Sequence, residues 1–347
     1  MIDLKSLQSR LKMVSSVCHR DKKPLILSLS SSVESNSVAY WGGVRVSDSF
    51  IIVSLVNVSQ LQFAECAPIL SVYADYLFVD AEKKHPFEIG DNSLDGPKAL
   101  FSNLLSAALI TFDNSKVFPW SPSRITSQAA VARIREVYGG NLSGASCSVI
   151  GLGNIGFKIA LHLIEEGCDV IAFGRNHDRL SKLVECLNLI KSDFTLAAAV
   201  PARNLDLAMA RSRATVLVAN SSSYISKRQL QLLGYPESEI LDVSKSSLDH
   251  EAHDYAHKSN NINYTRLDIG NELVTMVAST LKSLSLNLNQ TSPARLKFSL
   301  GESGFCVSGG FPGLAGDSVV DNAFNPSFIL GYVNKDRQFV SDFRVIG

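Results

Sequence analysis

The chain has 347 residues, of which 46% are hydrophobic and 19% are charged, and its 33 basic side chains balance 33 acidic ones. This length and composition predict an ordinary globular protein with two domains. A formal net charge of zero lacks the positive field that attracts nucleic acids and anionic membrane surfaces, so we expect neither as a partner.

The six cysteines and the N-terminal segment indicate the compartment. The cysteines form no Cys-x-x-Cys pair and no metal-type spacing, which favours a reducing compartment and predicts no metal centre. Leu4, Leu7, Leu11 and Val14 repeat at helical spacing between charged residues, which predicts an amphipathic helix and not a targeting signal. No window approaches the roughly 20 apolar residues of a membrane span. We therefore expect a cytoplasmic protein.

Up to residue 120, apolar runs alternate with helical spacing, which predicts an α/β domain. In chain order the expected elements are a strand at 24–29, a strand at 50–56, a helix over 57–73, a strand at 76–80 and a helix over 98–112. Two prolines and two serines in residues 118–123 then predict a domain boundary, with Ser123 or Thr126 as the N-cap of the next helix.

The most informative motif is Gly151-Leu152-Gly153-Asn154-Ile155-Gly156. It lies between an apolar run at 147–150 and a helical pattern that ends at Gly167, and a second apolar run follows at 170–173. A dinucleotide-binding fingerprint requires this context. The first glycine makes a tight turn, the second lets a pyrophosphate approach, and the third lets the helix pack on the strand. Because the pyrophosphate lies at the helix N-terminus, Asn154 and Ile155 join Gly151, Gly153 and Gly156 as candidate cofactor-binding residues.

The residues after the second strand indicate which dinucleotide is used. An acidic residue about 20 positions past the glycines usually binds the ribose 2′-hydroxyl of NAD, whereas an arginine suits a 2′-phosphate. Here Arg175 takes that place, Asn176 and Arg179 follow, and no carboxylate precedes Asp178. A guanidinium holds a phosphate through two charge-assisted hydrogen bonds. We therefore expect NADP rather than NAD; the alternative is a solvated arginine at a strand end.

Alternation of strands and helices continues to about residue 285, which predicts a doubly wound parallel sheet. Asn220 and Ser221 follow the expected strand at 216–220 and complete the candidate cofactor-binding set. Asp242 ends the next expected strand, where it either faces a cleft or caps a turn. The glycine-rich tail predicts a β-type extension that packs on the body or on a second copy, which leaves a homodimer open; an active-site lid is the alternative.

The predicted fold class is α/β: an N-terminal α/β catalytic domain at 1–122, a doubly wound Rossmann domain with linking helices at 123–285, and a glycine-rich C-terminal extension at 286–347. A helix that opens with Ser121-Pro122, followed by Asn141-Leu142-Ser143-Gly144 and the glycine turn, resembles the two-domain dehydrogenases that include the methylene-tetrahydrofolate, shikimate and amino-acid dehydrogenases. The resemblance covers roughly residues 120–285. It implies a substrate domain placed first and a substrate bound between the domains.

The first domain departs from those families. Tyr76 precedes Lys83 and Lys84 at a spacing unlike the tyrosine–lysine pair of the folate enzymes, and residues 90–96 match the Asn-Thr-Asp element of the shikimate group only loosely. The resemblance therefore implies a reaction class and no particular substrate.

Candidates for the chemistry are Lys84, Lys83 and Asp91. The lysines come just after the carboxyl end of an expected strand, where open α/β sheets place ligands. A lysine transfers protons when burial or cationic neighbours lower its pKa, and Asp91 could bind a substrate amine or hydroxyl. Their alternatives are solvated loop charges and a turn shaped by Asp91.

The function expected from these features is an NADP(H)-dependent oxidoreductase that acts on a small polar carbonyl, imine or alcohol in an interdomain cleft. The alternative is a nucleotide-binding regulatory protein or inactive partner protein with a Rossmann domain. A third reading is an isomerase or hydrolase that uses a bound NAD transiently.

Overall fold

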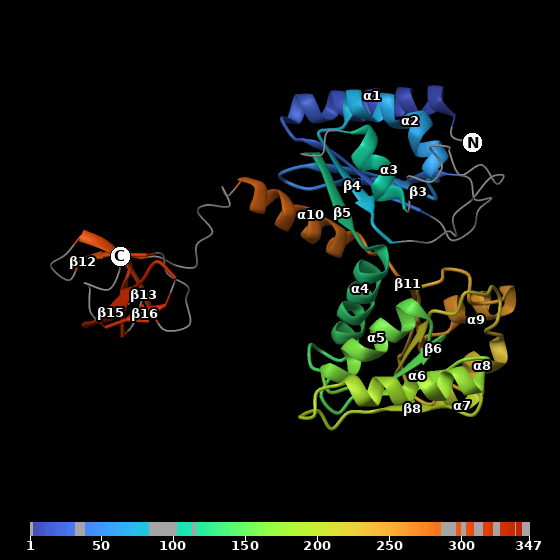
Figure 1. The fold of residues 1–347 in the computed structure, drawn as a ribbon. Coiled ribbons are helices and arrows are strands. Elements are labelled where there is room, and N and C mark those ends of the chain that lie inside the picture. The colour runs from blue at the N-terminus through green and yellow to red at the C-terminus, as the bar shows by residue number, and fades with distance from the viewer. Residues whose placement is uncertain are drawn as a thin grey trace, which may run out of the picture. The chain divides into compact units, whose positions relative to one another are not determined.

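The computed structural model in Figure 1 describes residues 3–31, 39–82, 103–112, 116–285, 296–299, 303–308, 315–321, 327–336 and 338–341. The chain divides into two compact units, Met1–Val274 and Thr275–Gly347. Among the described residues, no helix combines the length and the hydrophobicity that crossing a bilayer would need.

The first unit begins with an α/β layer. Its elements are α1 (Leu4–Asp21), β1 (Leu25–Ser30), β2 (Tyr40–Val46), β3 (Ile51–Val56), α2 (Gln60–Tyr73), β4 (Tyr76–Asp80), α3 (Leu104–Thr111) and β5 (Val117–Trp120). The strand order is β2-β3-β1-β4-β5, in which β2 runs antiparallel to β3 and the other pairs are parallel. The carboxyl ends of β1, β3, β4 and β5 therefore share one edge.

The hydrophobic pattern of the sequence explains this layer. Leu7, Leu11 and Val14 of α1 are buried in one cluster with alternate residues of β1, β3 and β4 and with residues of α2 and α3. The start of α2 is fixed by a capping box, in which Ser59 and Gln62 each accept a hydrogen bond from the other's backbone N–H.

The second α/β layer of the first unit contains the glycine motif. Its elements are α4 (Pro122–Val137), β6 (Ser146–Ile150), α5 (Asn154–Glu165), β7 (Asp169–Phe173), α6 (His177–Ile190), β8 (Ala199–Pro201), α7 (Leu205–Ala210), β9 (Ala214–Leu217), α8 (Lys227–Gln231), β10 (Ser238–Asp242), α9 (His250–Lys258) and β11 (Ile262–Arg266). The strand order is β11-β10-β9-β6-β7-β8, and every pair is parallel.

Helices cover both faces of this second sheet. Buried residues of α4, α5 and α6 form one cluster with alternate strand residues such as Val149 and Val216. Buried residues of α7, α8 and α9 form another with the intervening residues, among them Ile150 and Leu217. This is the doubly wound order of a Rossmann domain, and the predicted fold class is confirmed.

The sequence-based expectations were wrong in several details. Residues 117–120 form β5, and α4 begins at Pro122 with Ser121 as its N-cap, so neither Ser123 nor Thr126 caps it. Proline at the first helical position explains the early start, because it has no N–H to satisfy and its φ suits a helix. The strand expected at 216–220 ends at Leu217, and β2, β8 and α7 were not expected at all.

The second unit carries its own sheet. In the described part of the tail, the strands are β12 (Leu296–Ser299), β13 (Ser303–Ser308), β14 (Ser318–Val320), β15 (Ile329–Val333) and β16 (Phe339–Val340), in that order across the sheet. The helix α10 (Gly270–Ser285) begins in the first unit and continues into the second. The described residues of the tail are therefore mainly β-structured.

Candidate nucleotide-binding site

The three motif glycines have three different environments. Gly151 has a φ of +104°, and a Cβ there would lie 2.6 Å from the backbone nitrogen of Ala219 beyond β9. A Cβ at Gly156 would collide with the carbonyl oxygen of Gly151. A Cβ at Gly153 would meet no described atom within 4 Å. The first and third glycines are thus required by packing, whereas the second leaves open space beside the backbone.

That open space lies at the N-terminus of α5. Gly153 is the N-cap, and no described side chain caps the helix. The first N–H groups of a helix need partners, and together with the helix dipole they attract an anion. Asn154 and Ile155 form the first turn, and the Asn154 side chain is exposed. This cradle fits the pyrophosphate of a dinucleotide.

The candidate residues after β7 divide into two kinds. The Asn176 side chain accepts a hydrogen bond of 2.9 Å from the backbone N–H of Arg179 and so caps α6. The side chains of Arg175 and Arg179 are exposed, and neither has a hydrogen-bond or ion-pair partner among the described residues. Asn176 therefore has a structural role already, while both guanidinium groups remain available.

A third arginine, Arg203, was not recognised in the sequence and follows β8, the strand that pairs with β7. In the parallel pair of β7 and β8, Ala172 faces Pro201, and the Ala202 N–H donates to the Ala172 carbonyl at 2.8 Å. Arg175 and Arg203 each come two residues after the end of their strand, so both follow the carboxyl ends of neighbouring parallel strands. The Arg203 side chain is also exposed and has no partner among the described residues.

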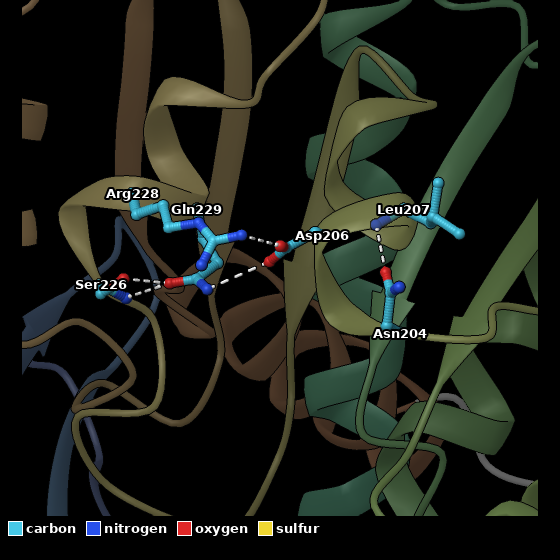
Figure 2. Close-up of polar contacts among 6 residues, drawn as sticks. All are labelled: Asn204, Asp206, Leu207, Ser226, Arg228 and Gln229. Atoms are coloured by element: carbon cyan, nitrogen blue, oxygen red, sulfur yellow. Dashed lines mark hydrogen bonds and ion pairs between the residues drawn. The ribbon is translucent and has the colours of Figure 1, made fainter.

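Asp206, the carboxylate closest in sequence to Arg203, is bonded to other residues. Figure 2 shows the Asp206 carboxylate accepting hydrogen bonds from Arg228 and Gln229 of α8, with N–O distances of 3.0 Å and 3.1 Å. The same figure shows Asn204 capping α7 through the Leu207 N–H, at 2.8 Å. Neither residue neutralises Arg203. The carboxyl edge of β7 and β8 therefore carries Arg175, Arg179 and Arg203, with Asp178 as an exposed carboxylate in the same stretch.

The loop after β9 carries Asn220 and Ser221. Asn220 is exposed, and the Ser221 N–H donates to the Ala219 carbonyl at 2.9 Å. Backbone bonds from Ser223 to Ser246 and from Tyr224 to Ser247 tie this loop to the one after β10. The two loops thus form one connected rim beside the glycine turn.

Asp242 organises the second of these loops. It is fully buried, and its carboxylate accepts hydrogen bonds from the Ser244 hydroxyl, the Lys245 N–H, the Ser247 N–H and hydroxyl, and the Tyr264 hydroxyl. Of the two roles considered for Asp242, the structure therefore supports the turn-forming one.

The carboxyl end of β4 is polar and connected to the second layer. Asp80 is buried and accepts hydrogen bonds from the backbone and hydroxyl of Ser31, at 3.0 Å and 2.9 Å. Glu82 accepts hydrogen bonds from Ser121 and Ser123 at the start of α4, and Lys158 of α5 donates to the Ser123 hydroxyl. Lys83, Lys84 and Asp91 lie outside the described residues.

Comparison with known proteins agrees with this geometry. Residues 146–266 match the NAD binding domain of 6-phosphogluconate dehydrogenase. The match runs from β6 to β11 and contains every candidate cofactor-binding residue named above. It supports a nicotinamide dinucleotide as cofactor and an oxidoreductase as the protein class.

Curated relatives match this chain over short stretches. Glutamyl-tRNA reductases from Sulfurovum sp. (strain NBC37-1) and Campylobacter concisus (strain 13826) are 36% and 39% identical over 67 and 61 residues. These matches cover 19% and 18% of this chain but only 15% and 14% of the two reductases. The chain thus matches about one seventh of the length of these relatives.

Solved structures show a distant likeness. L-tryptophan dehydrogenase from Nostoc punctiforme is 12% identical with a TM-score of 0.41, and the match covers 74% of this chain and 75% of that one. Ornithine carbamoyltransferase from Pyrococcus furiosus is 11% identical with a TM-score of 0.42, covering 76% and 87%.

Proposed function

We propose that the protein is an NADP(H)-dependent oxidoreductase that acts on a small polar carbonyl, imine or alcohol. The observation that supports the cofactor choice most directly is the group of Arg175, Arg179 and Arg203, which has no carboxylate partner among the described residues. A guanidinium group that lacks a carboxylate partner can bind a phosphate through two charge-assisted hydrogen bonds, whereas a ribose 2′-hydroxyl offers it no charge.

Each part of the site then has a task. The glycine turn and the first turn of α5 bind the pyrophosphate, and the arginines bind the 2′-phosphate. Asn220 and Ser221 lie along the rim where the nicotinamide would be oriented. The bound cofactor supplies hydride transfer, so the chain itself must orient the groups and move a proton.

For the proton we propose Lys84, with Lys83 and Asp91 as its neighbours in sequence. The support comes from the chain just before these lysines. Glu82, two residues before Lys84, accepts hydrogen bonds from Ser121 and Ser123, and the Ser123 hydroxyl accepts one from Lys158 in the helix that follows the glycine turn. The chain thus approaches the nucleotide-binding layer immediately before the two lysines. A small-molecule substrate and a homodimer belong to the same proposal.

The test is kinetic. Purified protein is screened for NADPH consumption with polar carbonyl and imine substrates, and Lys84→Ala is then compared with the natural chain. We expect the variant to lose turnover while its affinity for NADPH stays within a few-fold. Full turnover by the variant would remove this lysine from the mechanism. Tight NADPH binding without turnover of any substrate would favour a regulatory nucleotide-binding protein.

A further inference from the structure

A pair of histidine rings on α9 lies outside the nucleotide-binding site. The Nε2 atoms of His253 and His257, one helical turn apart, are separated by 3.2 Å. Their ring centroids are 4.4 Å apart. We propose that this pair binds a divalent transition metal of the zinc, copper and nickel class, with both Nε2 atoms as ligands.

The separation of the two nitrogens fits one metal ion between them. Zinc–imidazole bonds are about 2.0–2.1 Å long, so two nitrogens 3.2 Å apart subtend about 100–106° at the metal, close to the tetrahedral angle of about 109°. A direct N–H···N hydrogen bond also suits this distance. On an exposed helix such a hydrogen bond competes with water and contributes little, so a metal–nitrogen bond readily replaces it.

Tyr264 holds the rings from the side of the sheet. Its ring meets that of His253 edge-on at 5.8 Å between centroids and that of His257 at 6.0 Å. Its hydroxyl donates to the buried carboxylate of Asp242 at 3.0 Å. The tyrosine is thereby anchored, and the packing restricts the two imidazoles before any ligand arrives. Preorganised ligands lose less conformational entropy on binding.

The surroundings define the class of ion. The described residues include no group of three metal-ligating side chains, so water would complete the coordination sphere. Neutral imidazole nitrogens suit zinc, copper and nickel, and affinity should follow the general order that peaks at copper. Magnesium and calcium prefer oxygen ligands and should not compete. His250, on the same helix, instead lies 3.7 Å from an Asp254 oxygen.

The experiment is calorimetric titration of the full chain, without a histidine tag, with zinc chloride. We expect saturable binding that excess magnesium leaves unchanged, and a loss of affinity of at least about tenfold in both His253→Ala and His257→Ala. His250→Ala is the matched control and should bind zinc like the natural chain. One metal per two chains would also support the site, with the ion shared between copies.

Two results would overturn the proposal. One is the absence of saturable zinc binding by the natural chain. The other is zinc affinity that survives both substitutions while circular dichroism shows that the variants are folded. Because His257 is exposed and His253 is half-buried, both variants are expected to fold. NADPH affinity measured on the same samples should not change, which separates this site from the proposed cofactor site.

Discussion

The carbonyl oxygen of Gly151 occupies the space that a side chain at Gly156 would need. The first glycine of the motif thus faces the third across the turn, and α5 can leave the strand β6 only because neither residue carries a Cβ. Gly153, between them, contacts nothing in the described part of the chain at its own Cβ position. Stability and ligand binding therefore depend on different glycines of one motif.

Substitution of these glycines should separate the two roles. Gly156→Ala forces a methyl group into backbone, and we expect it to lower the free energy of unfolding by about 2 kcal/mol. Gly153→Ala should leave stability within about 0.5 kcal/mol, because its φ of −88° suits alanine, yet weaken NADPH binding by at least about tenfold. Urea unfolding and nicotinamide fluorescence measure both quantities. A stable Gly156→Ala variant would contradict the packing argument.

Substitution of the arginines that follow β7 and β8 should weaken the binding of NADPH and leave the binding of NADH nearly unchanged. Alanine in place of Arg175, Arg179 or Arg203 removes charge-assisted hydrogen bonds of about 1.5–3 kcal/mol, so NADPH affinity should fall at least about tenfold while NADH affinity changes little. Arg211, an exposed arginine at the other end of α7, provides the matched control. Equal losses for both nucleotides would disprove the assignment of a 2′-phosphate site.

Replacement of Asp242 should destabilise the second layer. The carboxylate is fully buried and receives donors from the loop after β10 and from Tyr264. Asp242→Ala leaves those donors unsatisfied, and we expect a loss of about 2–4 kcal/mol in chemical denaturation. Asp254→Ala, at an exposed position, should change stability by less than about 0.5 kcal/mol. Similar values for the two variants would refute a structural role for Asp242.

The cysteines should differ in reactivity. Burial raises the pKa of Cys66 and of Cys168 to about 12, so few of these thiols ionise at pH 8, whereas Cys186 is exposed. Alkylation of the native protein followed by mass spectrometry should label Cys186 well before the two buried cysteines. In the folded protein the pKa of each thiol lies above the value of about 8.5 for an unfolded cysteine. The folded protein therefore keeps this contribution to its free energy of unfolding at neutral pH, where both thiols are protonated. It loses the contribution as the pH rises from about 8.5 towards 12. Rapid labelling of Cys66 or unchanged stability at high pH would count against this burial.

The sequence predicted the centre of each sheet of the first unit better than its edges. The apolar runs of β1, β3, β4, β6 and β7 are buried on both faces, and such strands leave a strong signal. The strands that were missed, β2, β5 and β8, all lie at a sheet edge. Pro119 in β5 and Pro201 in β8 argue against a strand when only the sequence is known. An edge strand nevertheless accepts a proline on its unpaired side.

Because β8 was not predicted from the sequence, Arg203 was not recognised as a site residue. Arg203 gains its position from the pairing of Pro201 with Ala172, and that pairing joins segments about thirty residues apart in the chain. Local spacing could identify Arg175 and Arg179, because they follow a recognisable strand. The His253–His257 pair was also missed: its i,i+4 spacing was visible, but the support from Tyr264 depends on the fold.

The proposed function depends on the Rossmann domain binding a dinucleotide that carries a 2′-phosphate. The most direct test is to titrate the purified protein with NADPH and with NADH and follow nicotinamide fluorescence. We expect saturable NADPH binding at least about tenfold tighter than NADH binding. Equal affinity for the two nucleotides, tighter binding of NADH, or binding of neither would contradict it.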